Sequence, residues 1–360
     1  MRLRHLFEYS DINQAKADVL KSINALDPND EKGAELIDRI FRALNNEDIG
    51  GKIQQSFGPP MADERMSDDA KLQHIAKVAK IISTVDSDFS GLTNFLSALE
   101  QGKALNVNAL KNTVTTFNEL CNGDNITVKV FNSLMGYGAG IKRKGPGEFA
   151  LAMMSPNIRL ADGQGDLEID GLGHVELKTE TTSGGGRMGM GGPTSESQQK
   201  VLEKYKEQAP ELIADLQSRK SITIAPLMKL FNQYLPVTQQ GAKELRIALC
   251  KDMFALTFGD QFGSAMAQGF GQPDPKQAQM NFIKNNFEWY KAKDNFSTFI
   301  IMNVPLQKIL RASTGDELLK LYAGGHLSGG GAAFIHTCQV SEVDAQMKTS
   351  ASKAYYVGNN

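Results

Sequence analysis

The segment 163–180 reads GQGDLEIDGLGHVELKTE, and its pattern decides the fold expected around it. Two runs of alternating polar and apolar residues, 166–170 and 174–180, flank Gly171, Leu172 and Gly173. Alternation with a period of two is typical of a half-buried strand, and a three-residue connection containing glycine suits a tight turn. The segment therefore predicts an antiparallel β-hairpin.

The register of this hairpin is predicted from its two faces. The expected pairs on the polar face are Asp170 with His174, Glu168 with Glu176, and Asp166 with Lys178. The core-facing residues are Leu167, Ile169, Val175 and Leu177. A slip of one residue would set polar against apolar side chains throughout. The polar face then gathers Asp166, Glu168, Asp170, Glu176 and Glu180 around Lys178 alone, which indicates either a solvated sheet face or a place for a cation or substrate.

The residue types on this face suit phosphodiester hydrolysis. Carboxylate oxygens are ligands that Mg²⁺ and Mn²⁺ accept, so Asp166 and Glu176 on adjacent strands could share one cation, with the Leu177 carbonyl as a further ligand. Such a cation lowers the pKa of an attacking water and neutralises charge that develops on phosphate. Lys178 lies two residues beyond Glu176 and points to the same face, where it could orient the water or stabilise the phosphate.

Asp166, Glu176 and Lys178, preceded by the run Gly145-Pro146-Gly147-Glu148, resemble the motif of the PD-(D/E)xK nuclease superfamily. That superfamily includes restriction endonucleases, resolvases and phage-encoded nucleases. Its hairpin carries Asp on one strand and Glu-x-Lys on the next, and a glutamate on the preceding helix often completes the site. The resemblance covers about 144–192, with the segment 296–304 as a further strand, and Gly165 stands where the family often has proline.

The resemblance implies roles for five residues of this chain. The implied catalytic residues are Glu148, Asp166, Glu176 and Lys178, and the implied metal ligands are Asp166, Glu176, Glu148 and the Leu177 carbonyl. The spacing is most similar to that of phage-encoded members, which implies a viral origin.

Basic residues near the hairpin are candidates for contacts with nucleic acid. The predicted contacts are Lys142, Arg143, Lys144 and Arg187. The first three precede the turn at Gly145, and Arg187 lies in a glycine-rich segment whose bare backbone could approach a sugar-phosphate chain. The glycine-rich segment is equally compatible with a flexible linker.

The rest of the chain predicts helices on both sides of this core. Apolar residues recur at helical spacing in the first part of the chain, and further helices are expected at 195–219, 226–234, 241–257, 275–290 and 305–322, with strands at 296–304 and 331–340. The expected fold is α+β, with a restriction-endonuclease-like mixed-sheet core flanked by helices. Its divisions are a helical N-terminal region at 1–140, a nuclease-like core at 141–193 and 293–343, a helical insertion at 194–292, and a polar tail at 344–360.

Composition excludes several classes of protein. The 360 residues include 39 Lys and Arg against 41 Asp and Glu, which excludes a strongly basic histone-like protein but leaves room for a local basic patch. Three distant cysteines predict neither a disulfide framework nor a zinc site. No run approaches the roughly 18 apolar residues of a membrane span. We therefore expect that the protein has no membrane partner and is cytoplasmic. If it is phage-encoded, it would lie in the cytoplasm of the bacterial host or in the virion.

The predicted function is that of a Mg²⁺-dependent (or Mn²⁺-dependent) endonuclease that hydrolyses phosphodiester bonds, with DNA as its partner. The alternative is a non-catalytic structural or assembly protein of a phage particle, which keeps a nuclease-like core to bind DNA or protein. More than half of the chain is helical sequence outside the motif, as an interaction protein requires. A third reading is a Ca²⁺-binding module, against which stands the lack of an EF-hand loop. Homodimerisation and phage structural partners remain open.

Overall fold

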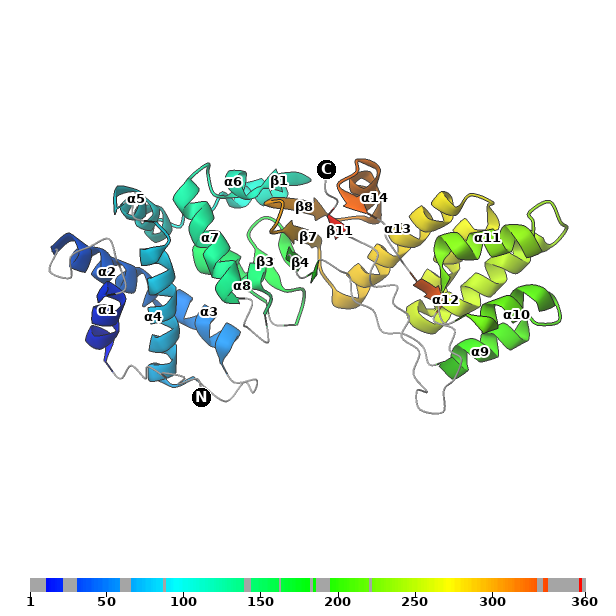
Figure 1. Ribbon diagram of the computed structural model, residues 1–360, viewed down its shortest axis with the longest axis horizontal. Coiled ribbons are helices and arrows are strands. Elements are labelled where there is room, and N and C mark those ends of the chain that lie inside the picture. Colours follow the sequence, from blue (N-terminus) through cyan, green and yellow to red (C-terminus); the bar gives the residue numbers. More distant parts are fainter. Residues whose placement is uncertain are drawn as a thin grey trace. The chain divides into compact units, whose positions relative to one another are not determined.

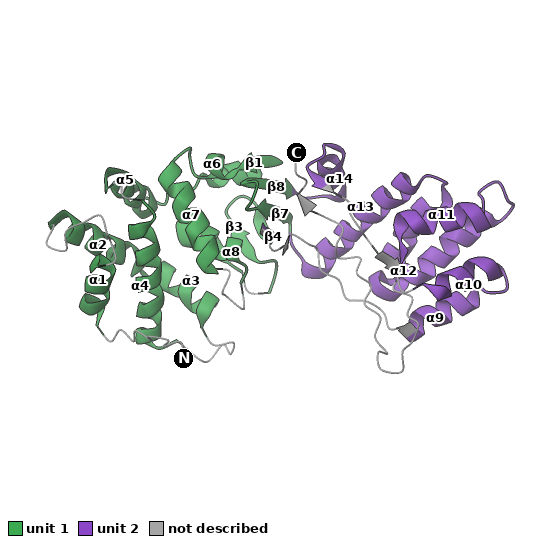
Figure 2. Ribbon diagram, in the orientation of Figure 1, with its two compact units in different colours: residues 1–179, 297–311 green, residues 180–296, 312–360 purple. Residues whose placement is uncertain are grey.

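The computed structural model describes residues 11–21, 31–58, 66–86, 89–138, 144–161, 163–181, 184–185, 195–219, 222–328, 333–335 and 356–357 (Figure 1). The chain divides into two compact units (Figure 2). Unit 1 comprises 1–179 and 297–311, and unit 2 comprises 180–296 and 312–360. The described part is α+β and mostly helical, as the sequence predicts at this coarse level.

Unit 1 combines the N-terminal helices with the main sheet. Its helices are α1 (Ile12–Lys21), α2 (Glu31–Leu44), α3 (Glu47–Phe57), α4 (Asp68–Thr84), α5 (Phe89–Glu100), the 3₁₀ helix η1 (Val107–Lys111), α6 (Phe117–Leu120), α7 (Asn125–Gly138) and α8 (Pro146–Met154). One continuous core runs from Ala15 in α1 to Ile309 in the sheet. The helices of the N-terminal region and the strands thus bury their apolar faces against each other.

The main sheet is mixed and open, and β4 lies inside it. The strands are β1 (Val114–Thr116), β2 (Ile158–Leu160), β3 (Leu167–Ile169), β4 (Gly173–Thr181), β7 (Thr298–Asn303) and β8 (Lys308–Ala312), in the order β1-β8-β7-β4-β3-β2. The short β5 (Gly184–Gly185) pairs with the end of β4. Because β3 and β7 flank β4, the strand that bears the Glu-x-Lys pair is held along both edges.

In the later part of the chain one predicted helix is wrong in part, and one predicted strand is found where its residues are described. The segment 305–322 was expected to be one helix, but it contains β8 and then α14 (Gly315–Ala323). Gln307 has a φ of +50° in the turn between β7 and β8, and Thr314 caps α14, so the chain reverses direction before the helix begins. The strand expected at 331–340 is described only as β10 (Ala333–Ile335), which pairs with β6 (Ile222–Thr223) outside the main sheet.

Unit 2 is built mainly from helices. These are α9 (Ser195–Lys204), α10 (Pro210–Ser218), α11 (Ile224–Tyr234), α12 (Ala242–Ala267), the 3₁₀ helix η2 (Gln268–Gly271), α13 (Pro275–Asp294) and α14, beside the small pair β9 (Leu327–Ser328) and β11 (Tyr356–Val357). The single helix expected at 195–219 is divided, because Pro210 has no N–H to continue a helix and instead begins α10. No helix in the described part of the chain is both long and apolar enough to cross a membrane.

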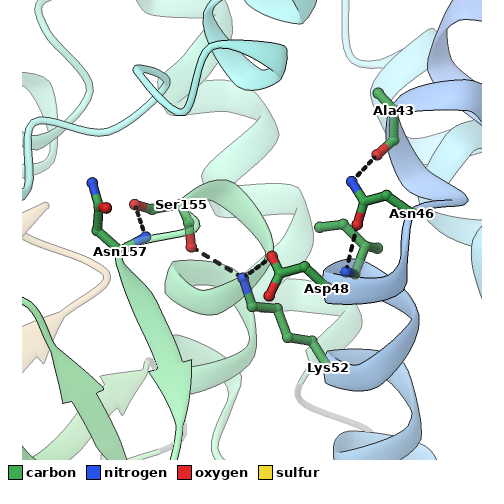
Figure 3. A network of polar contacts seen from close by, with 7 residues as sticks. Ala43, Asn46, Asp48, Lys52, Ser155 and Asn157 are labelled. Atoms are coloured by element: carbon green, nitrogen blue, oxygen red, sulfur yellow. Dashed lines mark hydrogen bonds and ion pairs between the residues drawn. The ribbon is translucent and has the colours of Figure 1, made fainter.

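Lys52 ties α3 to the end of α8 in unit 1 (Figure 3). Its side chain is only 4% exposed, and its Nζ donates to Asp48 Oδ2 at 2.6 Å and to the Ser155 carbonyl at 3.1 Å. Ser155 is the C-cap of α8, so the ammonium satisfies a carbonyl that the helix leaves unpaired. The same helix carries Glu148 in its first turn, at the end opposite to this contact.

Candidate active site

The β3–β4 hairpin has the predicted faces but a different register. Leu167, Ile169, Val175 and Leu177 are all buried, which confirms the core-facing side. The observed pairs are Leu167 with Val175, Glu168 with His174, and Ile169 with Gly173. The turn therefore consists of residues 170–172, closed by a hydrogen bond from Leu172 N to Ile169 O of 2.9 Å. The predicted register is wrong by two residues. Alternation predicts which face is buried, but a shift of the pairing by two residues leaves the same side chains on that face.

Gly165, the residue before Asp166, lies against the backbone of β4. Its φ is +63°, in the left-handed region that favours glycine. A Cβ at this position would lie only 2.8 Å from the Val175 carbonyl oxygen. The glycine is therefore needed for a close approach between two backbones at the point where Asp166 enters the hairpin.

Asp166 is held in place from both its backbone and its side chain. Its N–H donates to the Val175 carbonyl at 2.8 Å, and its Oδ2 accepts from Leu177 N at 2.9 Å. The same Oδ2 lies 3.7 Å from Lys178 Nζ. A carboxylate has about four acceptor positions, so these contacts leave capacity for a further cation.

Glu176 and Lys178 project from the same face of β4 and form an ion pair. The Glu176 side chain is 6% exposed, whereas those of Lys178 and Asp166 are each 25% exposed. Burial lowers the pKa of Lys178, but the carboxylates of Asp166 and Glu176 outweigh burial and raise it overall. Lys178 is thus a cation held between two carboxylates, which suits charge stabilisation better than proton abstraction.

Glu148 lies in the first turn of α8 and is 7% exposed. Burial, followed by the negative charge of Asp166, raises its pKa to about 7, while a hydrogen bond from the Gly145 backbone opposes the rise. Gly145 is the N-cap and Glu148 the third helical residue, the position from which a glutamate reaches back to the N-cap in a capping box. Glu148 therefore has a helix-capping role and also interacts electrostatically with Asp166 and Lys178.

The outer carboxylates of the hairpin form ion pairs with Arg159, a residue that the sequence analysis missed. Arg159 lies on β2 opposite Glu168, and its Nη2 reaches Glu168 Oε1 at 3.1 Å and Asp170 Oδ1 at 3.0 Å. The prediction that Lys178 alone compensates the acidic face is therefore wrong. Four of the five acidic residues therefore divide into an outer pair, Glu168 and Asp170, bound to Arg159 and an inner pair, Asp166 and Glu176, bound to Lys178.

Only one of the predicted nucleic-acid contacts falls within the described residues. Lys144 is half-buried, and its Nζ donates to the Ala161 carbonyl at 2.5 Å, so it braces the segment between β2 and β3. Lys142, Arg143 and Arg187 lie outside the described residues.

The inner pair, Asp166 and Glu176, offers carboxylate oxygens, which are donor atoms suited to a divalent cation. Asp166 and Glu176 already share one positive charge, the Lys178 ammonium, and oxygen donors of this kind are those that Mg²⁺ and Mn²⁺ take. Glu148 is close enough to Asp166 for their charges to interact. Within the described ranges, however, no three His, Cys, Asp or Glu side chains are arranged as a ready metal cluster. A metal would have to share or replace the contacts that Lys178 makes.

Comparison with known proteins gives no match to a protein-family model, to a curated protein or to a solved structure.

Proposed function

We propose that the protein is a metal-dependent nuclease that hydrolyses phosphodiester bonds in DNA. The observation that carries this proposal is the inner pair: two carboxylates from neighbouring strands that converge on one lysine at the end of a hairpin. The proposed fold of the surrounding sheet is restriction-endonuclease-like, and the origin that fits this resemblance is a phage.

The proposed chemistry assigns one task to each side chain. Asp166 and Glu176 would hold Mg²⁺ or Mn²⁺, which lowers the pKa of a water molecule and neutralises charge on phosphate. Lys178 remains protonated because both carboxylates raise its pKa, so it would stabilise the phosphate as negative charge develops. Glu148 would assist as a carboxyl group that titrates near neutral pH.

The proposal is tested by cleavage of duplex DNA with Mg²⁺, using Asp166→Asn and Lys178→Met. Both changes preserve the size of the side chain, and the asparagine retains an oxygen that can accept from Leu177 N. We expect each to lower the cleavage rate by at least about 100-fold, in line with losses of one electrostatic group in other enzymes. Glu168→Gln is the matched control, because Glu168 is on the same hairpin but bound to Arg159. Cleavage that survives both substitutions contradicts the proposal.

A second function, that of a non-catalytic assembly protein with a nuclease-like core, is favoured by one observation. Each acidic residue of the site has a structural partner: Asp166 accepts from the Leu177 amide, Glu176 pairs with Lys178, and Glu148 caps α8. Titration with Mn²⁺ separates the two functions. A nuclease binds the ion in a manner that Asp166→Asn weakens, whereas an assembly protein binds it equally weakly with or without the substitution.

A further inference from the structure

A polar groove lies beside the turn of the β3–β4 hairpin. It has a volume of about 740 Å³ and is open to solvent. We call it the asparagine groove; the side chains that characterise it are Lys103, Asn106, Asn108, Lys111, Asn122 and Asn157. They come from the loop after α5, from η1, from the turn before α7 and from the residue that precedes β2, and the hairpin turn at Asp170 and Gly171 lines the groove as well.

The charge of the asparagine groove is positive. Lys103 and Lys111 are both exposed, and Lys111 Nζ contacts the amide oxygen of Asn108 at 2.9 Å rather than a carboxylate. Asp170 is the one acidic side chain among its described lining residues, and Arg159 already pairs with it at 3.0 Å. Two lysines are therefore available to an anionic ligand.

The amide groups add hydrogen-bonding capacity without adding charge. Asn106 precedes η1 but its side chain makes no capping hydrogen bond, and the side chains of Asn108, Asn122 and Asn157 are exposed. Amides and lysines together are the groups that contact phosphate and sugar oxygens in protein–DNA complexes. No aromatic side chain lines the described groove, so it lacks the stacking surfaces on which proteins bind unpaired bases.

The position of the groove relates it to the proposed site. Asp170 lies at the turn of the hairpin and Asp166 at its open end, four residues apart along the chain. At roughly 3.3 Å per residue this separation is about 13 Å. The rise along one DNA strand is about 3.4 Å per base pair, so a duplex that runs parallel to β3 would cover this separation in about four base pairs.

We propose that the asparagine groove binds the sugar-phosphate backbone of duplex DNA, about four base pairs from the phosphate that is cut. The second half of this statement rests on the proposed nuclease function. The groove adds affinity and orientation, and it takes no part in the chemistry.

The test measures binding of a short DNA duplex by Lys103→Gln/Lys111→Gln over a range of salt concentrations. Both substitutions are made in the Asp166→Asn background without divalent metal, so that cleavage does not enter the result. Removal of two phosphate contacts should reduce the slope of log Kd against log salt by about 1.8. Lys77→Gln/Lys80→Gln is the matched control, because these exposed lysines lie on α4, away from the groove, and their loss should leave the slope unchanged.

An equal slope for the groove and control variants overturns the proposal. The proposal is also overturned if the groove variant loses affinity for single-stranded DNA or inorganic phosphate but keeps its affinity for the duplex. If the groove variant weakens duplex binding while wild-type protein with Mg²⁺ cuts no DNA, the nuclease function fails and the groove remains a DNA-binding site. Far-ultraviolet circular dichroism of both double variants establishes that each is folded.

Discussion

Replacement of Gly165 by alanine should destabilise the hairpin and disable the site together. At a φ of +63° an alanine in the left-handed region costs about 1–2 kcal/mol. Its Cβ would also lie 2.8 Å from the Val175 carbonyl oxygen, and relief of such a contact within a packed sheet costs about 1–3 kcal/mol more. We therefore expect unit 1 to lose about 2–5 kcal/mol of unfolding free energy.

The matched control is Gly123→Ala. Gly123 has a similar φ of +75°, but no atom lies within 4 Å of the place that its Cβ would take. Only the left-handed cost of about 1–2 kcal/mol then applies. Urea unfolding followed by far-ultraviolet circular dichroism compares the two variants. Equal losses of stability would refute the argument that Gly165 is required by its approach to β4, whereas a larger loss at Gly165 supports it.

Three further predictions concern single side chains in unit 1. The pKa of Glu148 rises from 4.5 to about 7 on folding, so its contribution to stability is full below about pH 4.5 and is lost as pH rises through 7. In thermal unfolding, Glu148→Gln should therefore reduce the fall in stability between pH 5 and 8 by up to about 3 kcal/mol. An unchanged pH profile would contradict the raised pKa of Glu148. Lys52→Met should cost about 1–2 kcal/mol in urea unfolding, since the Ser155 carbonyl loses a buried donor, and no loss would show that this contact is weak. Arg159→Ala should cost less than about 1 kcal/mol because its ion pairs are about half exposed, and a larger loss would mean that Arg159 holds the hairpin itself.

The hairpin illustrates how far the sequence predicts this structure. The faces of the hairpin follow from alternation, because burial of Leu167 and Val175 is the same for any even shift of register. The register itself depends on the backbone of Gly171 and Gly173, both at positive φ, and two glycines separated by one residue permit more than one turn. Sequence alone therefore placed Glu176 opposite Glu168, where the structure has His174.

The electrostatics of the site depend on partners that are distant in sequence. Arg159 forms ion pairs with Glu168 and Asp170 only because β2 pairs with β3 in the register that sets Arg159 opposite Glu168. Because β2 has only three residues, its alternation is too short to predict a strand there. The ion pairs of Arg159 with Glu168 and Asp170 could therefore not be predicted from the sequence. The raised pKa of Glu148 likewise depends on how α8 is buried, which composition and spacing do not specify.

The location of bound Mn²⁺ tests the central claim most directly. Crystals soaked in Mn²⁺ and measured for anomalous scattering should show a metal ion in contact with the carboxylates of both Asp166 and Glu176, and Asp166→Asn should abolish that signal. A DNA-cleaving protein whose Mn²⁺ lies elsewhere, or one that binds no Mn²⁺ at these two carboxylates, would contradict the account.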